Sequence, residues 1–343
     1  MTTLEADGTR APAGGESSRR ADRAATRAIA WIVLVAFIVA TANAILFSHQ
    51  HLLDVRLPML GLGTLLSSPG WLLLLLAARN RGAPWRWLAV AIAWGLFVAA
   101  FLAYIAEDRL QPLMADIGRA LMPLGERVAY LGPAAIIAPI VEEPAKAIGV
   151  LIVLLAIRRA GTMLTLGLGA ALGALTGLAF SLAEISLRMG EMVANVGYID
   201  LDGVFRIDWD NIWNAEQLQL VNRLFLFGLS DHALNSALAG VGLVQLLRGQ
   251  RGSALGWFVA ALACHALINS IGLTVGGWAF DTAMGVLAGP SGGTAALLVA
   301  GWLAAVAGFL IGQAWAAIVL RRGTRRTSLP VRASPEPASV MPM

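Results

Sequence analysis

The chain has 343 residues, of which 58% are hydrophobic and only 13% are charged, and its formal net charge is +4. Soluble globular chains carry about a quarter charged residues, so the composition excludes an ordinary soluble enzyme and indicates a polytopic membrane protein. No basic stripe alternates with aromatic residues, which argues against a nucleic-acid partner. The single cysteine, Cys264, excludes an internal disulfide and a multi-cysteine metal site.

Eight apolar segments of membrane-spanning length follow a polar N-terminal tail. Residues 1–27 and 321–343 lack an apolar period, so we expect disordered tails at both ends of one membrane domain, 28–320. The first tail leads into a full-length apolar segment, and no cleavable signal peptide is expected. The fold class is therefore an all-α bundle of about eight transmembrane helices, near 28–48, 58–78, 87–106, 130–157, 161–187, 223–247, 253–276 and 294–320.

Arginines orient these spans, because they gather in both tails and in alternate loops. The loop arginines are Arg79, Arg81, Arg86, Arg158, Arg159, Arg248 and Arg251. Acidic residues such as Glu107, Asp108, Asp200 and Asp202 concentrate in the other loops. By the positive-inside rule, the arginine-bearing loops and both termini are cytoplasmic, which predicts a multi-pass protein of the cell membrane.

Two predicted external loops are long. Residues 107–129 show apolar side chains at helical spacing, which predicts an amphipathic surface helix. Residues 188–222 mix aromatic and acidic side chains, as an interfacial segment does. The second loop is interpreted either as a lid over a site or as an inert membrane anchor.

The fourth span carries Glu142, Glu143 and Lys146 in its apolar run. Ionisable groups at such depth are costly and persist where a bundle interior or a water pocket uses them. Lys146 is three and four residues after the two glutamates, so it can reach either carboxylate. Pro144 disturbs the helix and makes room for water. A structural ion pair is the alternative, although one pair needs only one of the two carboxylates. We expect Glu142 to face water and Glu143 to hold a helix contact or orient a histidine.

Three further spans carry polar or small residues at helical spacing. The fifth has Gly169, Gly173 and Gly177, a face that lets another helix approach closely, and Glu184 follows on that face. His232 lies in the sixth span, and His265 and Asn269 lie one turn apart in the seventh. At about 1.5 Å per residue, Glu142, His232 and His265 are roughly 14 to 16 Å below the outer ends of their spans. The four helices should therefore bring these groups to one layer in the outer half of the membrane.

This set of residues suits hydrolysis in two ways. A carboxylate beside a histidine can activate water as a general base, and His and Asn donors can stabilise a tetrahedral oxyanion. Alternatively, Glu184, His232 and His265 could hold a catalytic zinc ion with an open position. We prefer the metal-free description, because no HExxH pair places two ligands on one turn. No cofactor is therefore firmly predicted, and zinc is the alternative.

The motifs resemble those of the PrsW-type intramembrane proteases. Glu142-Glu-Pro-Ala-Lys146 is similar to their EExxK motif, and Phe180-Ser-Leu-Ala-Glu184 is similar to FxxxE. The boxes His232-Ala-Leu-Asn-Ser and His265-Ala-Leu-Ile-Asn269 match the two histidine motifs that follow. The matching core covers residues 130–276.

The resemblance implies an activity and roles for the residues. PrsW-type proteases are related to the CAAX-prenyl-protease and bacteriocin-processing family, and by that relation Glu142 would be the base. His265 and Asn269 would then be the oxyanion donors. The best-known PrsW activity is cleavage of a membrane-spanning anti-sigma factor on its external side, which implies a single-pass membrane protein as substrate.

The sequence therefore predicts an intramembrane endopeptidase with Glu142, Glu143, Lys146, Glu184, His232, His265 and Asn269 in its site. A proton-coupled transporter is the first alternative, because intramembrane Glu, His and Lys also build proton relays. Against it, the halves of the chain show no inverted repeat. A non-catalytic scaffold that binds partner helices through its glycine face is the second.

Overall fold

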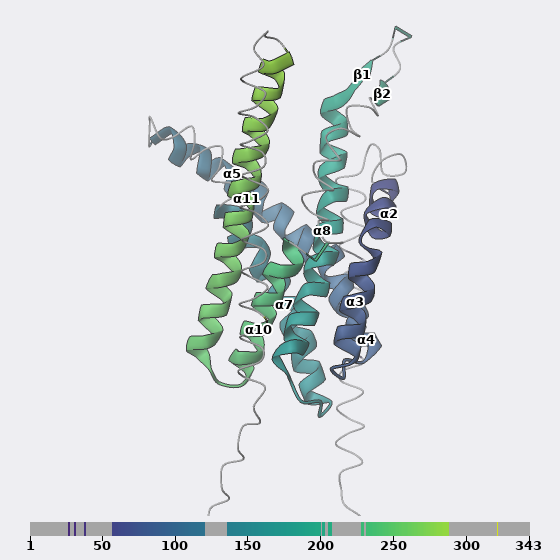
Figure 1. Cartoon of the computed structure of the whole chain (residues 1–343), viewed down its shortest axis with the longest axis vertical. Helices are drawn as coiled ribbons and strands as arrows, with labels where there is room; N and C mark the ends of the chain where they lie inside the picture. Colours follow the sequence, from purple (N-terminus) through teal and green to yellow (C-terminus); the bar gives the residue numbers. More distant parts are fainter. Residues whose placement is uncertain are drawn as a thin grey trace, which may run out of the picture.

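The computed structural model describes residues 57–120, 136–199, 201–202, 205–207, 228–229 and 231–287, with the single positions 27, 31, 38 and 321. The predicted tails, and the predicted spans 28–48 and 294–320, lie almost wholly outside these residues and stay predictions. Figure 1 shows the elements side by side as a bundle. In chain order they are α2 (Leu57–Leu66), α3 (Ser68–Arg79), α4 (Trp85–Ala93), the π-helix η2 (Trp94–Ala99), α5 (Ala100–Ala120), α7 (Ala138–Arg159), α8 (Leu166–Val196), β1 (Gly197–Ile199), β2 (Phe205–Ile207), α10 (His232–Leu247) and α11 (Arg251–Leu287).

The described chain is helical apart from one short hairpin. Strands β1 and β2 pair antiparallel, with Tyr198 opposite Arg206. The hairpin lies in the loop for which only an interfacial segment was expected, and it is an exception to the all-α prediction. The segment between the strands contains Asp202-Gly203, residue types that are common in turns.

Among the described residues, three helical stretches are long and apolar enough to cross a membrane: Trp85–Leu113, Leu166–Ser186 and Arg251–Asn269. Helices α2 and α3 would make a fourth span if the bent pair is counted as one. Helix α7 has 22 residues, about 33 Å of helix, which also matches the thickness of a bilayer core. The membrane assignment is thus supported, and the number eight stays a prediction.

The predicted span 58–78 is broken into two helices that meet at 65°. The break falls at Ser67, whose hydroxyl donates to the Gly63 carbonyl at 2.7 Å. Pro69 follows in the first turn of α3, where a residue without an N–H is tolerated. The proline therefore starts a new helix instead of continuing α2.

The two predicted external loops begin as extensions of helices. Helix α5 continues the third span to Ala120, so the helix expected after residue 107 is continuous with that span. It runs obliquely out of the bundle (Figure 1). Helix α8 extends beyond Glu184 to Val196, about nine residues past the predicted end of its span. This extension places Glu184 inside a helix, away from its end.

Helices α8 and α10 pack backbone to backbone through the predicted glycine face. A Cβ atom added at Gly169, Gly173 or Gly177 would overlap the carbonyl group of Gly240, Ser236 or His232, respectively. Only glycine allows such an approach, as in other small-residue helix contacts in membranes. The contact holds the first turn of α10, with His232, against the part of α8 that precedes Glu184.

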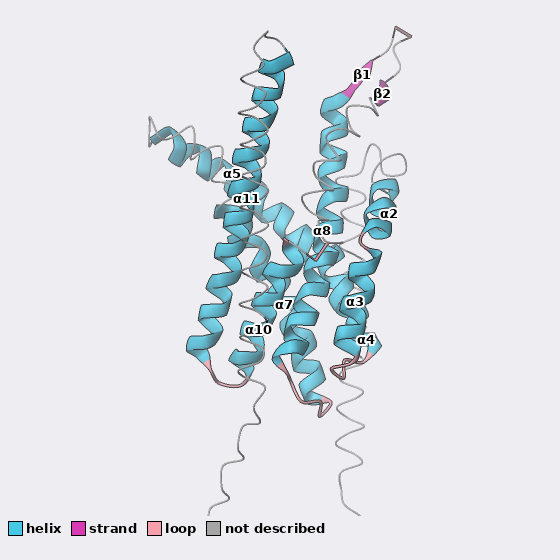
Figure 2. Ribbon diagram, in the orientation of Figure 1, coloured by secondary structure: helices cyan, strands magenta, loops and turns pink. Residues whose placement is uncertain are grey.

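The short turns that carry arginines lie at the same end of the bundle, as Figure 2 shows for the loops before α4, α8 and α11. Two of the turns are joined by side chains: Arg158 donates to the Leu247 carbonyl at 3.0 Å, and Arg248 donates to the Leu164 carbonyl at 2.6 Å. The structure thus agrees with one arginine-rich face. That this face is cytoplasmic stays a prediction.

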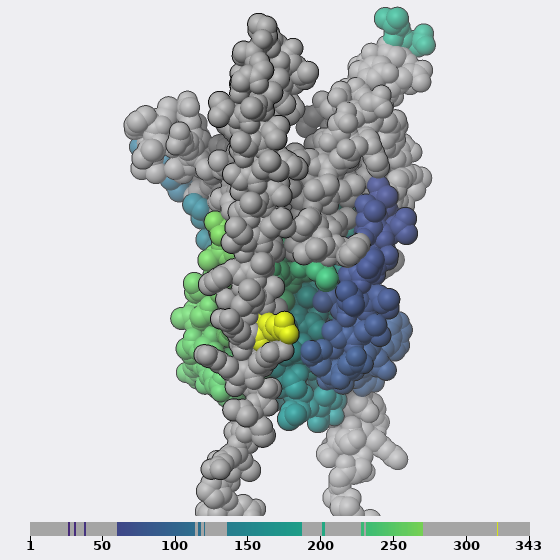
Figure 3. All heavy atoms as spheres, in the orientation of Figure 1, coloured from purple at the N-terminus to yellow at the C-terminus, as the bar shows by residue number. Residues whose placement is uncertain are grey.

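Helices α3 and α11 lie on opposite sides of the view in Figure 3, and each carries exposed large apolar side chains. On α3 they are Leu72, Leu73 and Leu76, and on α11 they are Leu255, Val259 and Leu267, each at least half exposed. Exposed apolar faces of this extent suit contact with lipid chains. The chain is a membrane protein.

Candidate active site

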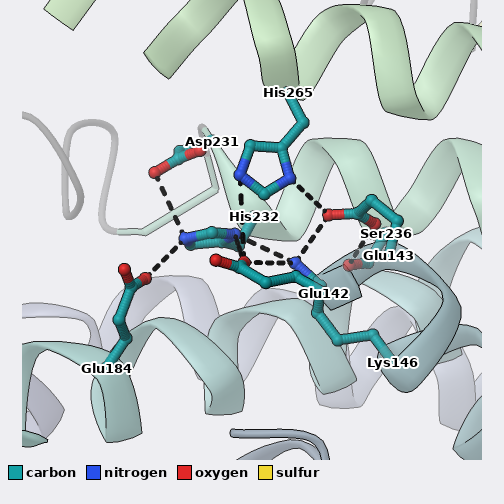
Figure 4. Close-up of polar contacts among 8 residues, drawn as sticks. All are labelled: Glu142, Glu143, Lys146, Glu184, Asp231, His232, Ser236 and His265. Atoms are coloured by element: carbon teal, nitrogen blue, oxygen red, sulfur yellow. Dashed lines mark hydrogen bonds and ion pairs between the residues drawn. The ribbon is translucent and has the colours of Figure 1, made fainter. Parts of the chain in front are cut away.

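Six of the seven predicted site residues meet in one buried cluster (Figure 4). Helix α7 provides Glu142, Glu143 and Lys146, and helices α8, α10 and α11 provide Glu184, His232 and His265. All six are at least nine-tenths buried. Asn269 lies one turn beyond His265 on α11 and is half-buried. The predicted grouping of these six side chains is therefore present, and their depth in the membrane stays a prediction.

Lys146 is the only cation of the described cluster other than the histidines, and it is fully buried. Its Nζ lies 2.6 Å from Oε1 of Glu143 and 3.3 Å from Oε2 of Glu142. It also donates to Nδ1 of His232 at 3.0 Å and lies 4.3 Å from the centre of the Phe180 ring. An ammonium with such partners compensates the charge of both carboxylates.

His232 has a different environment at each ring nitrogen. Nε2 donates to Oε2 of Glu184 at 2.8 Å, and a second carboxylate oxygen, Oδ2 of Asp231, lies 3.7 Å from the same nitrogen. Nδ1 faces Lys146 and lies 3.4 Å from Oε2 of Glu142. Phe180 packs edge-on against the ring. Glu184 therefore fixes the orientation of the ring and directs Nδ1 toward Glu142.

His265 repeats this arrangement from the opposite helix. Its Nδ1 donates to Oε1 of Glu143 at 2.9 Å, and its Nε2 lies 3.8 Å from Oε2 of Glu142. Ser236 donates to the other oxygen of Glu143 at 3.2 Å. Glu143 thus makes the helix contact and orients the histidine as expected from its place on α7.

Glu142 lies at the focus of the cluster. Its Oε2 faces Lys146 and one nitrogen of each histidine within 3.8 Å, whereas no described residue forms a hydrogen bond with its Oε1. The two glutamates therefore differ, because both oxygens of Glu143 are used in contacts with other helices. Of the two carboxylates, Glu142 is the one with an oxygen left for a water molecule.

The cluster contains more acid than base. Four carboxylates, those of Glu142, Glu143, Glu184 and Asp231, share one ammonium and two imidazoles, all of them buried. Buried carboxylates need compensating positive charge or hydrogen bonds. Protonation of a histidine or binding of a cation would supply that charge.

One group of donors in the described chain fits a metal ion. Glu142, His232 and His265 offer ligand atoms that all lie within 4.8 Å of one another. The buried Nε2 of His265 has no hydrogen-bond partner among the described residues. Nδ1 of His265 is held by Glu143, and Nε2 of His232 is held by Glu184. Two imidazoles and a carboxylate with such outer partners are typical of zinc sites. The sequence predicted Glu184 as the third ligand, but Glu142 takes that place, and Glu184 contacts Nε2 of His232 instead.

Sequence reasoning missed three residues that shape the site. Asp231 directly precedes the predicted His232. Ser236 lies one turn after His232 on α10, a spacing that could have indicated that both side chains face the cluster. Trp94 comes from the π-helical turn and donates through Nε1 to the carbonyl of Ala145 at 2.8 Å. Nothing in the sequence around Trp94 signals this contact, because it depends on how η2 packs against α7.

Comparison with known proteins gives one match. The family model described as PrsW family intramembrane metalloprotease matches residues 83–291, which include every helix of the cluster. No curated protein matches the chain, and no solved structure does.

Proposed function

The chain belongs to the PrsW family of intramembrane metalloproteases, and we propose that it hydrolyses a peptide bond of a single-pass membrane protein near the outer face of the membrane. The substrate class is that of membrane-anchored regulatory proteins such as anti-sigma factors. The observation that carries the proposal is the position of Glu142, whose Oε2 is paired with Lys146 and lies within 3.8 Å of a nitrogen of each histidine, while Oε1 is left for water.

In the proposed reaction, Oε1 of Glu142 takes a proton from a water molecule, and the water oxygen attacks the carbonyl carbon of the scissile bond. The bond between carbon and nitrogen then breaks, and the proton passes to the leaving amine. Lys146 forms an ion pair with the Glu142 carboxylate at 3.3 Å. The ion pair between Lys146 and Glu143 is retained when Glu142 becomes neutral.

His265 and Asn269 are proposed as donors to the oxyanion that forms on the carbonyl oxygen. Because Nδ1 of His265 already donates to Glu143, its Nε2 must also carry a proton to serve this role. The surplus of carboxylates in the cluster favours such a charged ring. Glu143 and Glu184 act as positioning residues, since each orients one histidine.

A zinc ion would be held by Glu142, His232 and His265. Bound there, it would act as a Lewis acid and make a bound water more acidic. The roles proposed above for Glu143 and Glu184, as outer partners of the histidines, are the same with the ion present.

Quantitative proteomics of membrane proteins tests the proposal. Cells that express the wild type should accumulate site-specific fragments that disappear with Glu142→Gln, because an amide keeps the shape but cannot take a proton. The Glu142→Gln protein should accumulate to the wild-type level, because Lys146 still has its ion pair with Glu143 at 2.6 Å and no buried charge is left without a partner. Glu143→Gln is the matched comparison, and it should lower both activity and thermal stability, because three contacts are changed.

The transporter alternative makes a different forecast. A proton-coupled transporter in liposomes would move protons across the membrane and would produce no fragments. Fragments that persist with Glu142→Gln would remove Glu142 as the base. If the wild type produces no fragments beyond those seen with Glu142→Gln, and if it moves protons across liposome membranes, the proposal that this cluster hydrolyses peptide bonds is refuted.

A further inference from the structure

Asp231 is held in an unfavourable backbone conformation next to the site. Its φ is 57° and its ψ is −123°, and it is the one non-glycine residue with positive φ in the described chain. Residues other than glycine adopt such angles at a cost of about 1–3 kcal/mol and often do so at functional sites. The strain therefore needs a compensating role.

The carboxylate of Asp231 gains little from this conformation inside the protein. Asp231 is the N-cap residue of α10, a position where Asp usually accepts a hydrogen bond from the first turn, yet it makes no such bond. Oδ2 is 3.7 Å from a nitrogen that already donates to Glu184, and the buried Oδ1 has no partner in the chain as described. Figure 4 shows Asp231 and Glu184 on the same side of the His232 ring.

Asn235, one turn later on α10, has the same property. It is fully buried, and neither its Oδ1 nor its Nδ2 forms a hydrogen bond with any described residue. Burying an amide whose oxygen and NH₂ both lack hydrogen bonds lowers the stability of the fold, typically by about 1–3 kcal/mol. Native structures keep few such groups, and each calls for an explanation.

Both residues lie on the side of α10 that faces α11. Leu238 and Ala239 pack against Ala261 of α11, and Gly242 lies close to Ala254 of the same helix. Asn235 precedes Leu238 by three residues and Gly242 by seven, so it shares their face. Asp231 precedes Asn235 by four. The unpaired polar groups therefore form a short row that starts beside His232 and runs between α10 and α11.

We infer that Asp231 and Asn235 bind the main chain of an unwound substrate segment and hold its scissile bond beside Glu142. This inference rests on the proposed function and adds the form of substrate recognised. A carboxamide matches a peptide group, because its NH₂ donates to a carbonyl and its oxygen accepts from an N–H. Oδ1 of Asp231 accepts a second N–H of the same strand.

The spacing of the row suits an extended peptide. Side chains four residues apart on a helix are about 5–6 Å apart at Cβ. In an extended strand, groups that point to the same side repeat after two residues, about 6.6 Å. Asp231 and Asn235 can therefore contact alternate residues of one strand. A substrate that stays helical has no such groups to offer, because its N–H and carbonyl groups are bonded within the helix.

Variants at Asn235 separate substrate binding from structural support. The probe is a synthetic single-span peptide that carries the cleavage site found by proteomics, with the purified full chain in detergent. Asn235→Leu removes the unpaired amide at similar volume, so the melting temperature should stay or rise, while KM should rise about tenfold with kcat little changed. Gln245→Leu is the matched control, since Gln245 is a buried amide with an unpaired oxygen at the other end of α10. It should leave KM unchanged.

Asp231→Gly tests the strained residue directly. Glycine accepts the positive φ without strain, so the melting temperature should rise while KM increases about tenfold. A peptide in which an ester oxygen replaces the N–H that binds Asp231 should have a higher KM with the wild type. The same replacement should change KM little with Asp231→Gly, because that variant has no carboxylate to accept the N–H.

A wild-type KM for both Asn235→Leu and Asp231→Gly would overturn the inference, whether or not the melting temperature of the variants falls. This result leaves the protease assignment intact as long as the wild type cleaves the peptide and Glu142→Gln does not. If the wild type fails to cleave any peptide, the proposed function is refuted first.

Discussion

At the scale of single residues, the charge balance of the cluster depends on Lys146. Its ammonium lies within 3.3 Å of two carboxylates and one imidazole in a region without solvent contact. Removing one partner of a buried ion pair lowers stability by more than the whole pair contributes to it, because the other charge stays buried and uncompensated. The stability of the fold and the state of the site are therefore linked at this residue.

Lys146→Ala should lower the free energy of unfolding by about 3–5 kcal/mol and abolish cleavage. Lys146→Arg keeps the charge and should be milder. Thermal unfolding in detergent and fragment formation in the same preparations measure both effects. A Lys146→Ala protein with normal melting temperature and normal cleavage would contradict the role of the ion pair.

The donor atoms of Glu142, His232 and His265 lead to a prediction about metal content. Purified protein incubated with zinc and then freed of excess ion should retain about one ion per chain. Glu184→Gln should weaken zinc binding by about 10–100-fold, because Glu184 orients His232 without being one of the three donors. Elemental analysis and zinc titration give these values without any activity assay.

Gln250→Ala is the control. It changes an exposed residue in the turn between α10 and α11, at the far end of α10 from the cluster, and should bind zinc as the wild type does. If the wild type takes up no zinc under these conditions, the metal-free use of Glu142 preferred in the sequence analysis gains support. If zinc binds equally well to Glu184→Gln, the assignment of Glu184 as an outer partner is wrong.

At the scale of elements, the contact of α8 with α10 brings the two motifs Glu184 and His232 together. Carbonyl groups of α10 lie where side chains at Gly173 and Gly177 would be. Backbone atoms cannot rotate away as a flexible side chain can, so an added methyl must push the helices apart. Such a shift would lengthen the bond between Glu184 and His232.

Gly173→Ala should therefore destabilise the protein by about 1–3 kcal/mol and reduce cleavage strongly. Gly256→Ala on α11 is the matched control, because the structure leaves open space around that position. Thermal unfolding and initial cleavage rates compare the two variants. Equal behaviour of Gly173→Ala and Gly256→Ala would show that the close approach of α8 and α10 is not needed.

At the scale of the whole molecule, the arginine-bearing turns share one end of the bundle, and the hairpin lies toward the other (Figure 2). Met163, in the turn between α7 and α8, and Leu201, between the strands, are both highly exposed. They provide labelling positions at opposite ends. The positive-inside rule assigns the end with Met163 to the cytoplasm.

In a Cys264→Ala background, Leu201→Cys in intact cells should react with a membrane-impermeant maleimide. Met163→Cys should react only after the membrane is opened. The same background without a new cysteine is the control. Labelling of Met163→Cys from outside would invert the orientation and place the cluster in the other half of the membrane.

The sequence by itself determined the class of the protein and much of its candidate site. Composition and apolar run length depend only on the chain, so the membrane assignment followed from them. Helical periodicity also acts locally, which is why the reach of Lys146 toward Glu142 and Glu143, and the close face of Gly169, Gly173 and Gly177, could be predicted.

Only the tertiary structure decided which groups meet across helices. Glu143 and His265 are 122 residues apart in the sequence, and their bond depends on how far α7 and α11 are rotated and shifted against each other. The same holds for Glu184 at the outer nitrogen of His232 and for the strained Asp231. Rotation and depth of a helix are set by side-chain packing with its neighbours. The periodicity of one helix carries no information about them, so the pairings within the cluster could not be predicted from spacing alone.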